Sequence, residues 1–179
     1  AIVAIEPSTG QILCMVSSPS YDPRLLEGKN RNKYHKFLTH DPQKPLLNRV
    51  IMGQYPPGST FKTTQGLTFL SEGIISPATP YPCHRGFYYK GLHVGCHSHA
   101  APLSLVPAIS TSCNAFFCKS FMDMIGNAKY RTRAEAIDRW HAYMSSFGLG
   151  RCLGTDVGPE ATGLMPSADY LKRVHGQWT

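Results

Sequence analysis

The chain has 179 residues, of which 42% are hydrophobic and 16% are charged, and it carries a formal net charge of +7. This composition is typical of one globular domain and excludes a disordered chain. The sequence has no apolar run of about 20 residues and no secretory leader pattern, so the chain taken alone is expected to be soluble.

The first 58 residues predict a β-hairpin followed by irregular chain. Two apolar runs, Ile2–Ile5 and 11–17, flank a Pro-Ser-Thr-Gly turn and are typical of strands. Because both runs are apolar at nearly every position, we expect other elements to cover both faces of the strands. Residues 18–58 contain many Pro, Asn, Lys and Gly residues and predict one short helix, at 34–38.

Four further helices are predicted from apolar residues at helical spacing and from glycine stops. They cover 60–70, 103–109, 134–147 and 167–174. The sequence shows no internal repeat and no domain boundary. A hairpin with helices on both sides predicts an α/β fold in which helices surround an incomplete sheet.

The positive charge is most concentrated at 29–36, in Lys-Asn-Arg-Asn-Lys-Tyr-His-Lys. A basic patch with interleaved aromatic residues can bind nucleic acid. No nucleic-acid-binding motif accompanies this one, so we interpret it as a solvated surface loop and expect no nucleic-acid partner.

The most informative segment is Pro-Pro-Gly-Ser-Thr-Phe-Lys at 56–62. The Pro-Pro-Gly breaker can start a helix, with Ser59 at or near its first turn. Residues i and i+3 lie on one helix face, so the Lys62 amine can reach the Ser59 hydroxyl. Serine becomes a nucleophile when a base takes its proton, and lysine is a base only when it is held neutral. No acidic residue follows Lys62 until Glu72, so no local carboxylate keeps the lysine charged.

A second motif, Ser112-Cys113-Asn114, lies downstream. Alone, a Ser-x-x-Lys pair arises by chance in many proteins, and a Ser-x-Asn element is often a helix cap or a turn. Together and in this order, the two match the first two of three motifs shared by penicillin-binding proteins and serine β-lactamases.

On these residues, the chain resembles the transpeptidase domain of class B penicillin-binding proteins, most closely the elongation type called penicillin-binding protein 2. The resemblance extends over nearly the whole chain. It includes the hairpin at 1–13, Ser-Pro-Ser-Tyr-Asp-Pro at 18–23, Tyr-Pro-Pro-Gly-Ser at 55–59 and Phe-Gly-Leu-Gly at 147–150. It implies part of the transpeptidase fold that these enzymes share with serine β-lactamases.

The resemblance implies a peptidoglycan D,D-transpeptidase that is a target of β-lactams and needs no cofactor for catalysis. Ser59 would attack the carbonyl of a D-Ala-D-Ala stem peptide, with Lys62 as its base. Ser112 would relay a proton to the leaving amine, and Asn114 would hold the substrate amide. The implied partners are stem peptides, β-lactams and proteins of the cell-elongation machinery. The implied location is the periplasm, on an anchor in the inner membrane.

The third motif of the family, Lys-Thr-Gly or Lys-Ser-Gly, does not occur in these 179 residues. Residues 1–179 are therefore expected to be the N-terminal and central part of a transpeptidase domain without its Lys-Thr-Gly strand. The family pocket takes one of its two oxyanion donors from that strand. We therefore expect residues 1–179 alone to acylate very slowly or not at all.

Two other functions remain open. A serine β-lactamase shares Ser-x-x-Lys but must hydrolyse its acyl-enzyme, and the sequence shows no obvious carboxylate placed as a deacylating base. A non-catalytic β-lactam sensor or binding module would keep the shape of the pocket without the chemistry.

Cysteine and histidine are dense between residues 83 and 113. The set that we expect to hold one structural zinc is Cys83, Cys96, His99 and Cys113. His97 is the reserve ligand for His99. A zinc with four protein ligands has no open position for water, so it would stiffen the loop that carries Ser112 and Asn114. A Cys83–Cys96 disulfide and a role as small buried hydrophobes are the alternatives.

The three remaining cysteines lie outside any motif. Cys14 and Cys118 fall in apolar runs and are expected in the core. Cys152 lies in a Gly-rich loop and is expected to be a free thiol.

Overall fold

The computed structural model describes residues 1–176, and they form two compact units. One unit contains 1–55 and 151–163, and the other contains 56–150 and 164–176. The sequence alone indicates no such division. Each unit joins segments that are distant in sequence, which local patterns do not record. In the described residues, no helix is both long and apolar enough to cross a bilayer.

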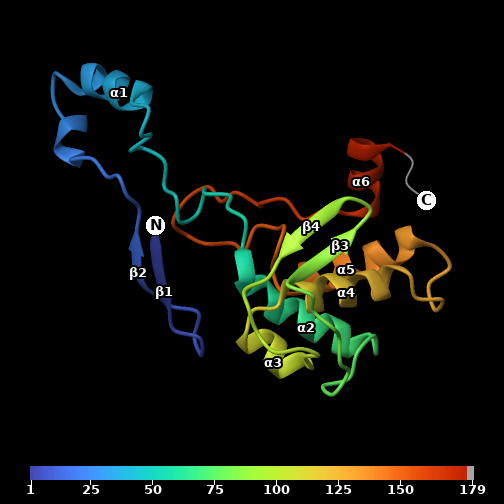
Figure 1. The fold of residues 1–179 in the computed structure, drawn as a ribbon. Helices are drawn as coiled ribbons and strands as arrows, with labels where there is room; N and C mark the ends of the chain where they lie inside the picture. Colours follow the sequence, from blue (N-terminus) through green and yellow to red (C-terminus); the bar gives the residue numbers. More distant parts are fainter. Residues whose placement is uncertain (177–179) are drawn as a thin grey trace. The chain divides into compact units, whose positions relative to one another are not determined.

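The first unit contains the predicted hairpin, formed by β1 (Ile2–Ile5) and β2 (Ile12–Val16) (Figure 1). The strands are antiparallel, with Ile2 opposite Val16 and an irregularity between Ala4 and Ile5. The expected cover on both faces is absent from the described residues, because nearly every residue of the two strands is exposed. The apolar pattern identified the strands correctly, but it does not specify which segment covers them.

After the hairpin comes a short 3₁₀ helix, η1 (Pro23–Leu26), whose N-cap residue is Asp22. The Asp22 carboxylate accepts a hydrogen bond from the Arg24 N–H and pairs with the Arg24 guanidinium. The α-helix α1 (Arg31–His40) packs against η1 and is longer at both ends than the helix predicted for 34–38. Leu38 is its only buried residue.

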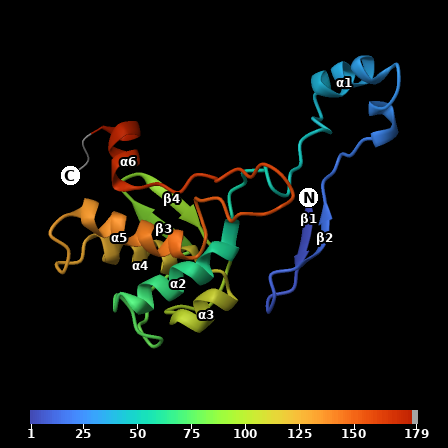
Figure 2. The same cartoon turned by 180° about the vertical axis from the view of Figure 1, so that it is seen from behind.

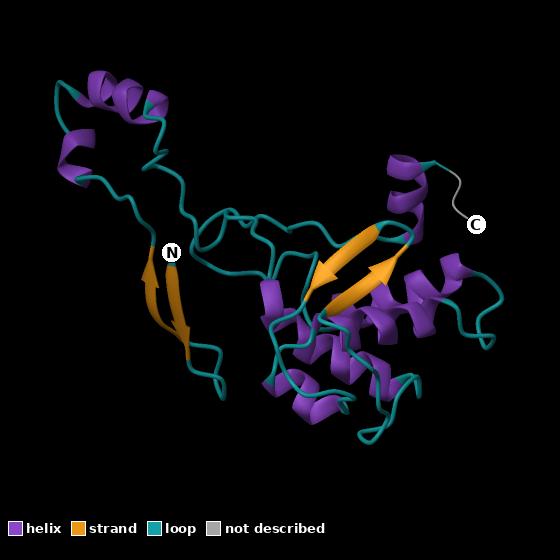
Figure 3. Cartoon of the chain, viewed as in Figure 1, coloured by secondary structure: helices purple, strands orange, loops and turns teal. Residues whose placement is uncertain are grey.

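The second unit is mainly helical (Figures 1 to 3). Its elements are η2 (Gly58–Thr60), α2 (Phe61–Ser71), β3 (Gly86–Tyr89), β4 (Leu92–Gly95), α3 (Leu105–Ser110), α4 (Asn114–Ile125), α5 (Arg133–Ser146) and α6 (Ala168–His175). Helix α4 packs against α2, α5 and both strands of the β3–β4 hairpin. The core around it includes the fully buried side chains of Phe69, Phe116, Met124 and Met144.

The four helices predicted after residue 58 are all present in the second unit, within a few residues of their expected ends. Two elements were not predicted, the β3–β4 hairpin and α4. Lys90 and Gly91 join the two strands and both have positive φ, at 44° and 85°. A two-residue turn of this kind matches the right-handed twist of a hairpin and is favoured by glycine.

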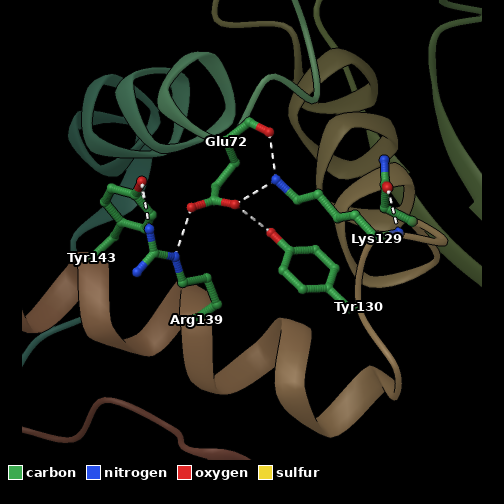
Figure 4. A network of polar contacts seen from close by, with 6 residues as sticks. Glu72, Lys129, Tyr130, Arg139 and Tyr143 are labelled. Atoms are coloured by element: carbon green, nitrogen blue, oxygen red, sulfur yellow. Dashed lines mark hydrogen bonds and ion pairs between the residues drawn. The ribbon is translucent and has the colours of Figure 1, made fainter.

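Hydrogen bonds and ion pairs of a buried carboxylate connect the end of α2 to the α4–α5 region (Figure 4). Glu72 is the C-cap residue of α2, and its side chain is 7% exposed. Its carboxylate accepts hydrogen bonds from Arg139 Nε and the Tyr130 hydroxyl, each at 2.7 Å. Lys129 Nζ donates both to this carboxylate and to the Glu72 carbonyl.

Burial by itself raises the pKa of Glu72, but the hydrogen bonds from Lys129, Tyr130 and Arg139 outweigh it and lower the pKa to about 2. The ordinary value is 4.5. Because the folded-state pKa is the lower one, the stabilisation is fully present above about pH 4.5 and is lost as the pH falls toward 2.

We predict that Glu72→Gln lowers the free energy of unfolding at pH 7 by about 2 kcal/mol, because it leaves two cations without their counter-charge. The loss is smaller than for a fully buried pair because both cations are partly exposed to solvent. Urea unfolding at pH 7 and at pH 3 measures it, and the difference from the unmodified protein should shrink at pH 3.

Glu27→Gln is the matched control, because Glu27 is exposed and has no described ion pair. We expect it to change stability by less than about 0.5 kcal/mol. An equal loss in both variants, or a Glu72→Gln effect that does not vary with pH, would contradict the assignment.

Candidate active site

Ser59 lies where η2 leads directly into α2. Gly58, the residue before it, has a φ of 61°, which a glycine adopts without strain. Lys62 lies on the first turn of α2, and its Nζ is 3.2 Å from Ser59 Oγ. The predicted contact between these side chains across one helical turn is therefore present.

Ser112 meets this pair from the chain between α3 and α4. Its backbone is left-handed, with a φ of 53°, an uncommon conformation for a residue with a side chain. Lys62 Nζ donates to the Ser112 carbonyl at 2.7 Å and to Ser112 Oγ at 2.8 Å. Ser112 Oγ donates to Ser59 Oγ, also at 2.8 Å. The three polar groups form a closed triangle through which a proton can move.

Two opposing effects act on the Lys62 amine. Burial lowers its pKa, and the nearby Cys96, Cys113 and Cys118 thiols, when ionised, raise it by a smaller amount. The net result is a pKa below the ordinary value of 10.5. None of the hydrogen bonds or ion pairs described for Lys62 involves a carboxylate. The amine therefore loses its proton more readily than an exposed lysine does.

Asn114 is the first residue of α4, and its side-chain amide is held by the β3–β4 hairpin. Asn114 Nδ2 donates to the Gly95 carbonyl at 2.7 Å. This contact fixes the rotamer of Asn114 and leaves its Oδ1 free of any described partner. The sequence did not identify the role of Gly95, although the Lys-Gly turn at 90–91 was the available signal for a hairpin there.

The four predicted metal ligands converge within the same unit. The ligand atoms of Cys83, Cys96, His99 and Cys113 all lie within 4.8 Å of one another. All three cysteines are free thiols, which does not match the alternative of a Cys83–Cys96 disulfide. The reserve ligand His97 is exposed and is not in the group.

The His99 ring is oriented as a metal-bound imidazole would be. His99 Nδ1 is 2.7 Å from the Ala100 carbonyl, so Nδ1 carries the proton and Nε2 has a free lone pair. His99 Nε2 is buried and has no hydrogen-bond partner. A buried polar atom without a partner is costly, and a metal ion removes that cost. Three thiols and one imidazole also match a closed tetrahedral zinc site.

Two of these sulfur atoms accept hydrogen bonds from the beginning of α4. The Ala115 N–H donates to Cys96 Sγ at 3.3 Å, and the Phe116 N–H donates to Cys113 Sγ at 3.4 Å. Burial raises the pKa of Cys96. The hydrogen bond from the Ala115 N–H and the neighbouring Cys83, His99 and Cys113 side chains lower it by more, so the net shift is downward. Burial raises the pKa of Cys113 to about 12. The cluster therefore caps the helix that begins with Asn114.

The other three cysteines are not members of this group of four. Cys14 is exposed, so the expectation that it belongs to the core is wrong, because the hairpin around it is uncovered. Cys118 is partly buried on α4, and Cys152 is an exposed free thiol as expected.

Comparison with known proteins agrees with this geometry. The family profile described as penicillin binding protein transpeptidase domain matches residues 1–177. The peptidoglycan D,D-transpeptidase MrdA of Salmonella typhimurium is 35% identical over 184 residues, which cover 98% of this chain and 27% of MrdA. The chain thus spans about a quarter of the length of this curated relative.

Solved structures give the same result. Pseudomonas aeruginosa PBP2 in complex with WCK 5153 superposes with a TM-score of 0.80 at 34% identity, over 99% of this chain and 39% of that one. Penicillin-binding protein A of M. tuberculosis, solved as a penicillin G acyl-enzyme complex, superposes with a TM-score of 0.71 at 30% identity. That match covers 94% of this chain and 39% of the M. tuberculosis chain.

The chain therefore belongs to the penicillin-binding protein transpeptidase family. The resemblance to its class B, elongation-type members, drawn from the sequence motifs, is confirmed. The predicted α/β transpeptidase fold is confirmed as well.

Proposed function

We propose that the protein carrying this sequence is a serine D,D-transpeptidase that cross-links peptidoglycan stem peptides and is acylated by β-lactams. The observation that carries the proposal is the triangle of Lys62 Nζ, Ser59 Oγ and Ser112 Oγ, with no edge longer than 3.2 Å. Acyl transfer needs a nucleophile, a base and a route for the proton, and this arrangement supplies all three.

In the proposed reaction, Ser59 Oγ attacks the carbonyl of the penultimate D-Ala, and its proton passes to the neutral Lys62 amine. The proton then moves through Ser112 Oγ to the leaving D-Ala nitrogen as the C–N bond breaks. Asn114 Oδ1 accepts a hydrogen bond from the peptide and orients it. An acceptor amine then attacks the Ser59 ester, forms the cross-link and returns the proton to Ser59.

The alternative functions have less support. A serine β-lactamase needs a base that activates water, and none of the hydrogen bonds described for Ser59, Lys62, Ser112 and Asn114 involves a carboxylate. A non-catalytic sensor needs only the shape of the pocket. The lowered pKa of Lys62 favours a reacting site over a sensor.

We also propose that Cys83, Cys96, His99 and Cys113 hold one structural zinc. The support is their convergence and the unpartnered Nε2 of His99. When bound, the zinc supplies a rigid cross-link and no catalytic water. The chain's own residues transmit that rigidity, because Cys113 lies between Ser112 and Asn114 and Cys96 adjoins Gly95.

The similarity to elongation-type proteins supports two further proposals, a location in the periplasm on a membrane anchor and an association with the cell-elongation machinery. The net charge of +7 suits work on an anionic polymer, and no nucleic-acid partner is proposed.

We predict that a labelled penicillin forms a covalent adduct at Ser59 in the full-length protein that carries this sequence. Intact-mass measurement of the protein and of its Ser59→Ala variant tests this. Only the unmodified protein should gain the mass of the drug, because alanine has no nucleophilic oxygen. The control is Ser110→Ala on the exposed end of α3, which should label normally. Equal labelling of the Ser59→Ala variant would overturn the proposal.

We predict that the acylation rate of the full-length protein rises with pH along a limb whose apparent pKa lies below that of an ordinary lysine. The reason is that the reaction needs the neutral amine of Lys62, whose pKa is lowered by burial. Lys62→Arg should reduce the rate by about 100- to 10,000-fold, because arginine stays protonated.

Lys119→Arg on α4 is the control for that change, and it should acylate at the normal rate because Lys119 is exposed and pairs with Asp123. Stopped-flow acylation between pH 6 and 10 provides the measurement. A Lys62→Arg variant with an unchanged rate would exclude Lys62 as the base.

We predict one zinc per chain in protein purified without a histidine tag, measured by elemental analysis. His99→Ala and Cys113→Ala should each lose the metal, whereas Cys152→Ala and His97→Ala should keep it. Hydrogen exchange should become faster at 112–116 when a chelator removes the zinc, since binding is coupled to local folding. Metal-free protein with a Cys83–Cys96 disulfide in its mass spectrum would replace this proposal with the oxidised form.

A further inference from the structure

The segment around α1 has a concentration of positive charge that the catalytic chemistry does not use. Residues 29–40 contain Lys29, Arg31, Lys33 and Lys36 and no acidic residue. All four are exposed, and none has an ion pair in the part of the chain that the structure describes. The structure places three of these cations, Arg31, Lys33 and Lys36, on helix α1, which extends the short helix predicted at 34–38 into the segment expected to be a loop.

The helix gathers part of this charge around one aromatic ring. Residues at i, i+3, i+4 and i+7 share one face of a helix, and Lys33, Lys36, Phe37 and His40 have this spacing. We call these four residues the basic face of α1. Phe37 is 66% exposed, whereas Leu38 on another side of the helix is buried. A large ring left in solvent among cations is available for contact with a ligand.

This arrangement does not stabilise the helix itself. Arg31 and Lys33 lie in the first turn, where the exposed backbone N–H groups already carry partial positive charge. The first turn has no acidic residue, and Asn30 makes no side-chain cap. Cations in the first turn and a missing N-cap both disfavour this helix. Residues that lower local stability in this way often belong to a functional surface.

We propose that the basic face of α1 binds peptidoglycan itself, as a holding surface on the unit that does not contain Ser59. The inference rests on the proposed function for the identity of the polymer. Lysine ammonium groups pair with the carboxylates that recur along the peptide stems. The Phe37 ring packs against the apolar face of a pyranose ring.

Other classes of partner fit this surface less well. A membrane-binding helix needs a broad apolar face, and Phe37 is the one large apolar side chain on this face. A stable protein partner needs about 600 Å² or more on each side around an apolar centre, which one ring does not provide. A regular polymer needs only weak contacts that repeat along its length.

The test is co-sedimentation with purified, insoluble peptidoglycan, in a Ser59→Ala background so that no acyl-enzyme contributes to binding. The variant Lys33→Gln/Lys36→Gln/Phe37→Ser should bind about tenfold more weakly at low salt. The matched control is Lys172→Gln/Arg173→Gln/Val174→Ser on α6, which also removes two exposed cations and one exposed apolar side chain. It should bind within about twofold of the parent protein.

Circular dichroism of both variants verifies that α1 and α6 remain folded. Equal binding by the α1 variant and its parent, or an equal loss in the α6 control, would overturn the inference. So would α1-dependent binding to anionic lipid vesicles or duplex DNA in place of peptidoglycan.

Penicillin labelling of the same α1 changes in the full-length protein with Ser59 intact separates this inference from the proposed function. Normal labelling with α1-independent sedimentation would remove the holding surface and leave the transpeptidase. A lack of labelling in the unmodified protein, with α1-dependent sedimentation, would remove the transpeptidase and leave the holding surface.

Discussion

The contact between Lys62 and Ser112 is the constraint on which the rest of the second unit depends. One amine bonds to the carbonyl and to the hydroxyl of a residue 50 positions away. To make both bonds, α2 and the α3–α4 connection must lie side by side, and Ser112 must adopt a left-handed backbone. Phe69 of α2 and Phe116 of α4 belong to one buried core cluster, and this packing holds α2 and α4 together. Packing therefore brings two short motifs together, and neither motif has a catalytic geometry alone.

Ser112-Cys113-Asn114 serves two proposed sites through alternate residues. Ser112 Oγ donates to Ser59 Oγ and Asn114 Nδ2 donates to the Gly95 carbonyl, while Cys113 is fully buried in the thiol cluster. The sulfur atoms of this cluster accept hydrogen bonds from backbone N–H groups in the first turn of α4. The carbonyl of Gly95, the residue before Cys96, accepts a hydrogen bond from the Asn114 amide and fixes its orientation. A change in the cluster therefore alters Ser112 and Asn114 through covalent neighbours and not through a long path. The proposed sulfur ligand and the proposed catalytic groups thus share one turn of chain without sharing atoms.

The sequence predicted what depends on spacing along one element. The contact between Ser59 and Lys62, the four helices after residue 58 and the Cys96-x-x-His99 pair follow from local periodicity or motif spacing. The density of cysteine between 83 and 113 added Cys83 and Cys113 to that pair. The sequence did not predict what depends on packing between segments. The two-unit division and the link from Asn114 to Gly95 involve segments distant in the chain, and the exposure of the hairpin around Cys14 depends on whether such a segment covers it. Helix α4 was missed because its first residues were assigned to the second motif, although its apolar residues continue to Ile125.

Each end of α2 carries a charge that the helix dipole disfavours, and only one of the two is offset by neighbouring counter-charges. Lys62 lies in the first turn, where the partial positive charge of the helix disfavours a cation. Glu72 lies at the other end, where the partial negative charge disfavours an anion, yet it is ionised. Lys129 and Arg139 offset that second conflict, whereas no described carboxylate offsets the first. An acidic residue beside Lys62 would stabilise the helix and raise the pKa of the amine, and the base would then be lost. The conflict that is left unrelieved is the one that the proposed chemistry requires.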